Sequence, residues 1–163
     1  MADKSFSVEL NGVDELVKKL EGLKEDMKLK GGRFALRKAA QVIRDQARQN
    51  AQQLDDPSTP ASIPKSIVER WNGRLFKASG DLGFRIGVLG GAKAVETKTN
   101  KKGKEKTTGS EVFYWRFLEF GTEKMAARPF MRPAAEQAGQ KATDVFITQY
   151  GLALDRALKR AGK

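Results

Sequence analysis

Apolar and polar residues alternate in two short stretches of the chain, at residues 5–10 and 81–89. This period of two is typical of a β-strand that buries one face and leaves the other in water. Each stretch therefore predicts a strand. The apolar positions are Phe6, Val8 and Leu10 in the first, and Leu82, Phe84, Ile86 and Val88 in the second.

Apolar residues recur at helical spacing in three longer segments. They predict helices at about 13–27, at about 33–53 and from Pro133 to about 160. The second helix has a stripe rich in alanine, which permits close packing, and a basic opposite face. We expect Gly31-Gly32 to break the chain between the first two helices, because glycine is a poor helix former. Pro133 suits the first turn of a helix.

The segments between these elements are less regular. Three prolines in residues 54–64 predict an irregular loop, and residues 65–71 favour one or two helical turns. Residues 91–110 contain six lysines, and residues 96–109 contain no large apolar side chain, so the segment predicts a flexible arm or an extended hairpin. The aromatic residues of 112–120 fit either a strand or a helix. We favour a short helix or irregular segment that ends at Gly121.

These elements together predict an α+β fold. We expect a small antiparallel or mixed β-sheet packed against two or three long helices, with a long Lys-rich flexible arm at 91–110. At 163 residues, the chain is most simply a single domain over 1–163. The long C-terminal helix at about 133–160 completes it.

Charge adds a candidate surface. The chain carries 31 Lys and Arg against 20 Asp and Glu, a formal net charge of +11. The excess is concentrated in residues 30–48, in the arm and in the last nine residues. Such patches indicate a polyanion or an acidic protein surface nearby, or simply a solvated surface. The candidate contacts with a neighbouring subunit or with DNA are Arg37, Arg44, Lys101, Lys102 and Lys104.

The absence of histidine and cysteine excludes the commonest metal ligands, thiolate nucleophiles and disulfides. A metal-dependent nuclease built on Asp81 and Glu96-Thr97-Lys98 fits the residue types. However, Glu96 falls in the arm, where no apolar strand would hold it rigid. We therefore expect neither an enzyme nor a cofactor. The polar N-terminus does not resemble a signal peptide, and no apolar run is long enough for a membrane span.

Residues 114–134 form the most specific segment. Gly121 follows Phe120 where the chain must turn, which predicts a positive φ. Either Phe130 or Met131, which lie between two Arg-Pro pairs, is expected to fill the core. Glu119 is the sole acidic residue of its aromatic stretch, and Arg128 or Arg132 is the nearest candidate for a charge-assisted pair.

With this segment as its most specific part, the chain resembles the neck or tail-component family of lambda-type long-tailed bacteriophages over about residues 6–150. The resemblance depends mainly on Leu-Glu-Phe-Gly-Thr and the Arg-Pro-Phe-Met-Arg-Pro-Ala that follows it. It implies a virion structural protein that acts in head–tail joining or tail completion as part of an oligomeric ring. The residues that carry the motif are Glu119, Phe120, Gly121, Thr122, Arg128, Pro129, Phe130, Arg132 and Pro133.

The resemblance also implies partners and a location. The partners would be further copies of the chain, other neck, head-completion or tail-terminator proteins, and packaged DNA through non-specific contact, with no membrane. The protein would be assembled in the bacterial host cytoplasm and lie at the head–tail junction of the virion. The alternative is a free basic DNA-binding protein, which explains the charge but not the motif.

Overall fold

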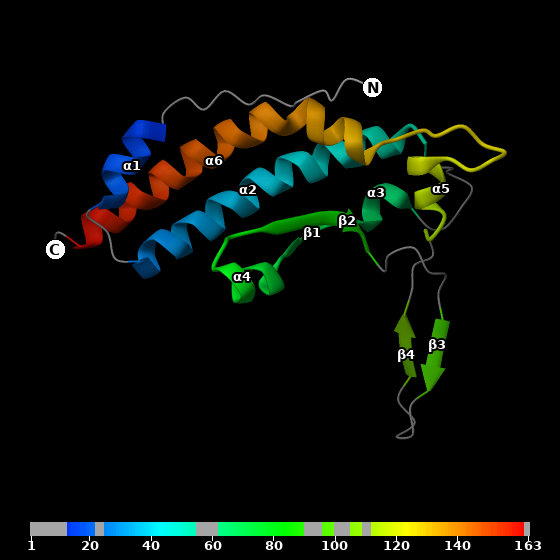
Figure 1. Cartoon of the computed structure of the whole chain (residues 1–163), viewed down its shortest axis with the longest axis horizontal. Coiled ribbons are helices and arrows are strands. Elements are labelled where there is room, and N and C mark those ends of the chain that lie inside the picture. Colours follow the sequence, from blue (N-terminus) through cyan, green and yellow to red (C-terminus); the bar gives the residue numbers. More distant parts are fainter. Residues whose placement is uncertain are drawn as a thin grey trace. The chain divides into compact units, whose positions relative to one another are not determined.

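The structure is a computed structural model that describes residues 13–21, 25–54, 62–89, 96–99, 105–108 and 112–161 (Figure 1). The fold is α+β, as predicted. The elements in chain order are α1 (Val13–Glu21), α2 (Glu25–Gln52), α3 (Ile63–Ser66), β1 (Ile67–Trp71), α4 (Gly73–Ser79), β2 (Phe84–Val88), β3 (Glu96–Thr99), β4 (Glu105–Thr108), α5 (Trp115–Phe120) and α6 (Met131–Ala161). The strand predicted at 5–10 and most of the loop predicted at 54–64 lie outside the described residues.

The chain divides into two compact units, each with its own hydrophobic cluster. The first unit consists of Met1–Ile43, Glu69–Arg85 and Glu136–Lys163. The second unit consists of Arg44–Val68 and Ile86–Ala135. Both long helices, α2 and α6, contribute residues to both units.

In the first unit, α1 packs on the C-terminal part of α6 (Figure 1). Leu16 of α1 and Leu154 of α6 are the buried residues of this cluster, and the partly buried side chains of Leu20, Ile147 and Leu158 pack against them. The hydroxyl of Tyr150 donates a hydrogen bond of 3.2 Å to the carbonyl oxygen of Lys28. Desolvation by burial, with a smaller effect of Glu25, raises the pKa of Tyr150. The tyrosine is therefore a neutral donor that joins α6 to α2.

The predicted break at Gly31-Gly32 is wrong, because α2 continues through both glycines. A Cβ atom at Gly31 would lie 3.3 Å from the Cβ of Ala153 and 3.3 Å from the ring of Tyr150. A Cβ atom at Gly32 would lie 2.8 Å from the side chain of Leu82. The two glycines therefore provide the space for α6 and Leu82 to approach α2, and tertiary packing outweighs their low helix propensity.

The helical turns predicted at 65–71 are also wrong for most of that segment. Only α3 is helical, and residues 67–71 form β1, which pairs with β2. The N–H of Asn72 donates to the carbonyl of Gly83 at 2.8 Å, and the N–H of Leu89 to that of Ser66 at 2.7 Å, as in an antiparallel pair. The β-branched residues of β1 favour a strand once a partner is present. The second predicted strand is confirmed as β2.

The hairpin between β1 and β2 contains α4, which the sequence pattern did not predict. The side chain of Asn72 caps its first turn by accepting a hydrogen bond of 3.3 Å from the N–H of Leu75. Gly80 ends the helix with φ of 78°, a left-handed conformation that glycine adopts without strain. Asn and Gly at these two positions are the ordinary signals for the two ends of a helix.

The core of the second unit gathers small residues of α2 and α6 around larger ones. Its buried members are Ala47, Ala51, Ile63, Ile67, Val88, Val112, Phe130 and Ala134. Alanine at the helix positions lets the larger side chains approach the helix backbone closely. The Ala-rich stripe predicted for the second helix is therefore used for close packing, as expected.

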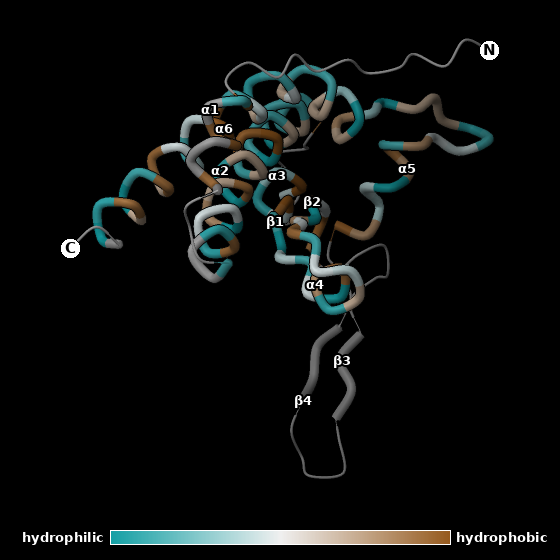
Figure 2. The backbone as a smooth tube through the Cα atoms, turned by 60° about the vertical axis from the view of Figure 1, so that its left-hand side comes forward, coloured by the Kyte–Doolittle hydropathy of each residue, from teal (hydrophilic) through white to brown (hydrophobic). Residues whose placement is uncertain are grey.

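In the arm, β3 and β4 form an antiparallel pair in which Glu96 lies opposite Thr108 and Thr99 opposite Glu105. The sequence predicted either a flexible arm or an extended hairpin for residues 91–110. The pairing of 96–99 with 105–108 fits the hairpin. Figure 2 shows hydrophobic and hydrophilic residues interspersed along α2 and α6. Within the described ranges, none of the helices combines the length and the apolar character of a membrane span.

A candidate assembly site at the α5–α6 corner

The α5–α6 corner, residues 112–134 of the second unit, contains the motif that the sequence singled out. Helix α5 ends where the N–H of Gly121 donates to the carbonyl oxygen of Phe117 at 2.8 Å. Gly121 has φ of 75°, so the predicted positive φ is confirmed. This conformation lets the chain reverse directly after Phe120.

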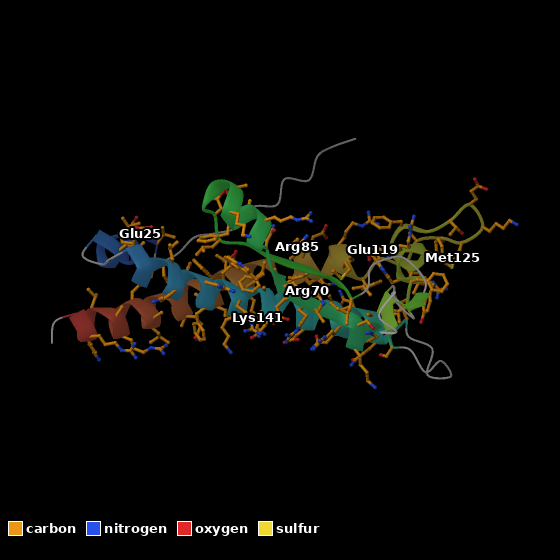
Figure 3. All side chains as sticks on the ribbon, turned by 90° about the horizontal axis from the view of Figure 1, so that it is seen from below. Glu25, Arg70, Arg85, Glu119, Met125 and Lys141 are labelled. Carbon is orange, nitrogen blue, oxygen red and sulfur yellow. The ribbon has the colours of Figure 1, made fainter. Side chains whose placement is uncertain are left out.

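The loop after Gly121 folds back onto α5. Thr122 and Met125 form an isolated antiparallel bridge, with N–H to O distances of 2.9 and 3.3 Å. The N–H of Arg128 then donates to the carbonyl oxygen of Leu118 at 2.7 Å. Figure 3 labels Glu119 on α5 and Met125 on this loop. The turn thereby brings the start of α6 to the side chain of Glu119.

The carboxylate of Glu119 accepts the free N–H groups at the start of α6. Oε2 accepts from the N–H of Phe130 at 2.8 Å and from that of Met131 at 2.9 Å. Oε1 accepts from the N–H of Arg132 at 3.1 Å and from its Nε at 3.3 Å. The side chain is only 2% exposed. A helix N-terminus leaves such donors unpaired and carries a partial positive charge, so a buried carboxylate is stabilised there.

These contacts decide between the predicted partners of Glu119. Arg132 forms the ion pair, and its Nη2 also donates to the carbonyl oxygen of Glu119 at 2.9 Å. Phe130 fills the core, as one of the two expected residues, and Met131 is partly buried. The three backbone donors were not predicted, although Pro133 in the first helical turn indicates that unpaired N–H groups lie just before it.

We expect Gly121→Ala to destabilise the fold by about 2–3 kcal/mol. Its φ of 75° is strained for alanine, and the new Cβ would lie 2.9 Å from both the backbone nitrogen of Ala127 and the backbone oxygen of Met125. Backbone atoms of a hydrogen-bonded turn have little room to move. Denaturant unfolding measures the loss. Gly87→Ala is the matched control, because nothing lies within 4 Å of a Cβ there; equal losses in the two variants would contradict the proposed steric cause.

The corner presents an exposed aromatic stripe, which we define as Phe113, Phe117 and Phe120. Their exposed fractions are 38%, 41% and 66%. Phe117 and Phe120 lie three residues apart on α5, and Phe113 lies in the turn just before that helix. Met125, 38% exposed, follows in the loop. The guanidinium of Arg132 lies 5.5 Å from the ring of Phe120. Large apolar side chains gathered in this way are typical of a protein interaction surface.

The remaining motif residues frame this stripe. Thr122 forms the bridge to Met125, the side chains of Arg128 and Pro129 are exposed, and Pro133 is partly buried in the first turn of α6. In the segment they frame, the carboxylate of Glu119 accepts hydrogen bonds from the helix N-terminus, and the three aromatic side chains are partly exposed.

The predicted charged contacts lie in different parts of the chain. In the first unit, Arg37 is exposed, with its Nε 3.6 Å from Oε1 of Glu69. In the second unit, Arg44 is mostly buried and its Nη2 lies 2.7 Å from Oδ1 of Asp45. Lys101, Lys102 and Lys104 lie outside the described residues.

Of the two carboxylates considered for a nuclease, Asp81 accepts a hydrogen bond of 2.7 Å from the hydroxyl of Ser79. The backbone of Glu96 begins β3. Within the parts of the chain that the structure describes, no group of three acidic side chains has the arrangement of a metal site. The nuclease hypothesis therefore gains no support from the geometry of these residues.

Comparison with known proteins supplies the family. No curated protein and no solved structure matches the chain significantly. A family model does match, over residues 14–121, and it describes the tail component gp10 of bacteriophage HK97. The match covers about two thirds of the chain and ends at Gly121 of the corner. The match itself confirms the resemblance expected from the sequence. The chain belongs to the HK97-gp10-like family of bacteriophage tail components.

Proposed function

We propose that this tail component acts at the head–tail junction, in head–tail joining or tail completion, as one copy in an oligomeric ring. The observation that carries the proposal is the exposed aromatic stripe on a corner whose backbone is fixed by Glu119. A tail component lies in the virion and contacts other structural proteins of the phage. In this role the chain acts by contact, without a catalytic step.

The carboxylate of Glu119 and the three N–H groups that it accepts, those of Phe130, Met131 and Arg132, form what we call the clasp. The clasp supports a docking role for the stripe. A rigid surface loses little conformational entropy when it binds. A closed ring needs two different surfaces on each copy, so that one copy's stripe meets another surface of the next copy. We propose that the stripe is one of these two surfaces. The arm at 91–110, with Lys101, Lys102 and Lys104, is proposed as a further contact with a neighbouring subunit or packaged DNA.

An early stop codon in the gene of the phage that encodes this chain tests the role. We expect electron micrographs of the lysate to show separate full heads and free tails, or tails of abnormal length, because an unfinished junction prevents joining. The defective end then locates the protein in the particle.

Two further results interpret the experiment. Supplying the wild-type chain from a plasmid should restore complete particles and thereby serves as the control. Normal, infectious particles without the chain would overturn the proposed role at the junction and would favour the alternative of a free DNA-binding protein.

A further inference from the structure

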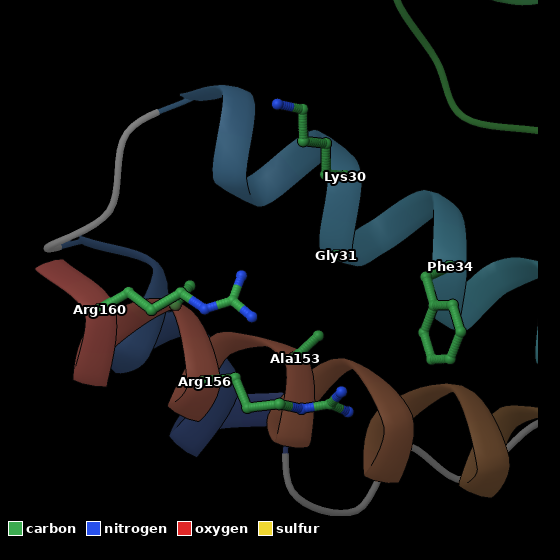
Figure 4. Close-up of a pocket in the computed structure, with 7 residues that line it drawn as sticks. Lys30, Gly31, Phe34, Ala153, Arg156 and Arg160 are labelled. Atoms are coloured by element: carbon green, nitrogen blue, oxygen red, sulfur yellow. The ribbon is translucent and has the colours of Figure 1, made fainter.

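Two adjoining grooves of the first unit share Lys30 and Phe34, and together we call them the double groove. The smaller groove, of about 260 Å³, lies between α2 and α6 (Figure 4). Its other lining residues are Gly31, Ala153, Arg156, Ala157 and Arg160. The larger groove, of about 580 Å³, is completed by Arg33, Arg37, Glu69, Arg70, Trp71 and Phe84.

The double groove is strongly basic. Six of its lining residues are Lys or Arg, and Glu69 is the only acidic one. Arg33 lies over the ring of Trp71, 4.3 Å from its centroid, and Arg37 lies beside Glu69. Three other cations line the double groove, namely Lys30, Arg70 and Arg160. Among the described residues, no carboxylate lies within 4 Å of their side-chain nitrogens.

The double groove also has an apolar centre. Phe34 is 44% exposed and forms the wall that the two grooves share. Figure 4 shows its ring extending from α2 towards α6. Trp71 and Phe84 pack edge to face at 5.4 Å in the larger groove. An exposed aromatic ring among several cations favours a ligand that is both anionic and apolar.

We propose that the double groove binds an acidic peptide segment with one large apolar side chain, supplied by another protein of the phage particle. The apolar side chain would pack on Phe34, and its flanking carboxylates would pair with Lys30, Arg70 and Arg160. This site is separate from the aromatic stripe, and it requires no particular position of the protein along the tail. It therefore goes beyond the role proposed at the junction.

Two observations disfavour other occupants. A DNA backbone offers phosphates but no apolar side chain to pack on the exposed ring of Phe34. The stripe of a second copy would bring Arg116 and Arg132, which lie 5.9 and 5.5 Å from the rings of Phe117 and Phe120, towards the cations of the groove. Charge complementarity therefore favours an acidic partner.

Fluorescence anisotropy with the full chain tests the proposal. The probe is a labelled short peptide with one central Phe between runs of Asp and Glu. We expect saturable binding with a Kd of about 10 µM that weakens about tenfold in Lys30→Glu and in Arg70→Glu. Phe34→Ser should weaken it about fivefold through the lost apolar contact. Circular dichroism confirms that each variant is folded.

Matched controls lie on α6 of the same unit, outside the groove lining. Lys141→Glu and Leu152→Ser change an exposed cation and an exposed apolar side chain, and both should leave the Kd within about twofold. The proposal is overturned if the peptide does not bind saturably, or if replacing its Phe by Ser leaves the Kd unchanged. Tighter binding of a short DNA duplex, weakened by the same variants, would instead identify a polyanion surface.

Discussion

Replacing Glu119 by alanine is expected to lower the free energy of unfolding by about 3–5 kcal/mol. The carboxylate accepts the N–H groups of Phe130, Met131 and Arg132, and these donors lose their acceptor together. Each unpaired donor costs about 1–3 kcal/mol, and water entering beside the exposed Pro129 offsets part of that cost. The melting temperature should fall by about 10 °C, measured by calorimetry or circular dichroism.

Two further variants show whether the clasp is the cause. Glu119→Gln keeps the shape and one acceptor oxygen but turns an NH₂ group towards the other donors, so we expect about half of that loss. Glu123→Ala removes an exposed carboxylate from the following loop and should change stability by less than about 0.5 kcal/mol. A loss in Glu119→Ala no larger than in Glu123→Ala would contradict the proposed clasp.

The clasp shows how far local sequence signals could predict this corner. The positive φ of Gly121, a core residue at either Phe130 or Met131 and a charge pair for Glu119 all follow from residue type and spacing. The structure contains each of them, with Phe130 as the core residue. The choice between Arg128 and Arg132 depends on the path of the loop. The bridge between Thr122 and Met125 determines that path, and it has no distinct signal in the sequence.

The errors elsewhere share one physical origin. Gly31-Gly32 predicted a break because glycine is intrinsically unfavourable in helices, but the approach of Ala153 and Tyr150 makes its small size useful. Residues 65–71 predicted helical turns, but 67–71 form β1, whose pairing partner, β2, lies more than ten residues further along the chain. In both cases a contact between distant residues outweighs the local preference. The double groove was missed for the same reason, since its lining comes from α2, β1, β2 and α6.

The second large effect concerns assembly rather than folding. Replacing Phe117 and Phe120 together by serine should weaken association between copies roughly a thousandfold, because two buried aromatic contacts at an interface contribute about 2 kcal/mol each. Both side chains are already substantially exposed, so the melting temperature of the monomer should change little. Complementation of the stop-codon phage by a plasmid-borne variant measures function, and sedimentation measures association.

The control variants separate a lost interface from a lost fold. Leu152→Ser removes a comparably exposed apolar side chain from the first unit and should complement like the wild type. Phe120→Leu keeps an apolar side chain on the stripe and should retain most of the complementation. If the double serine variant melts normally and also complements normally, the stripe is not an assembly surface. If it fails only after unfolding at a much lower temperature, the rings stabilise the corner instead of joining copies.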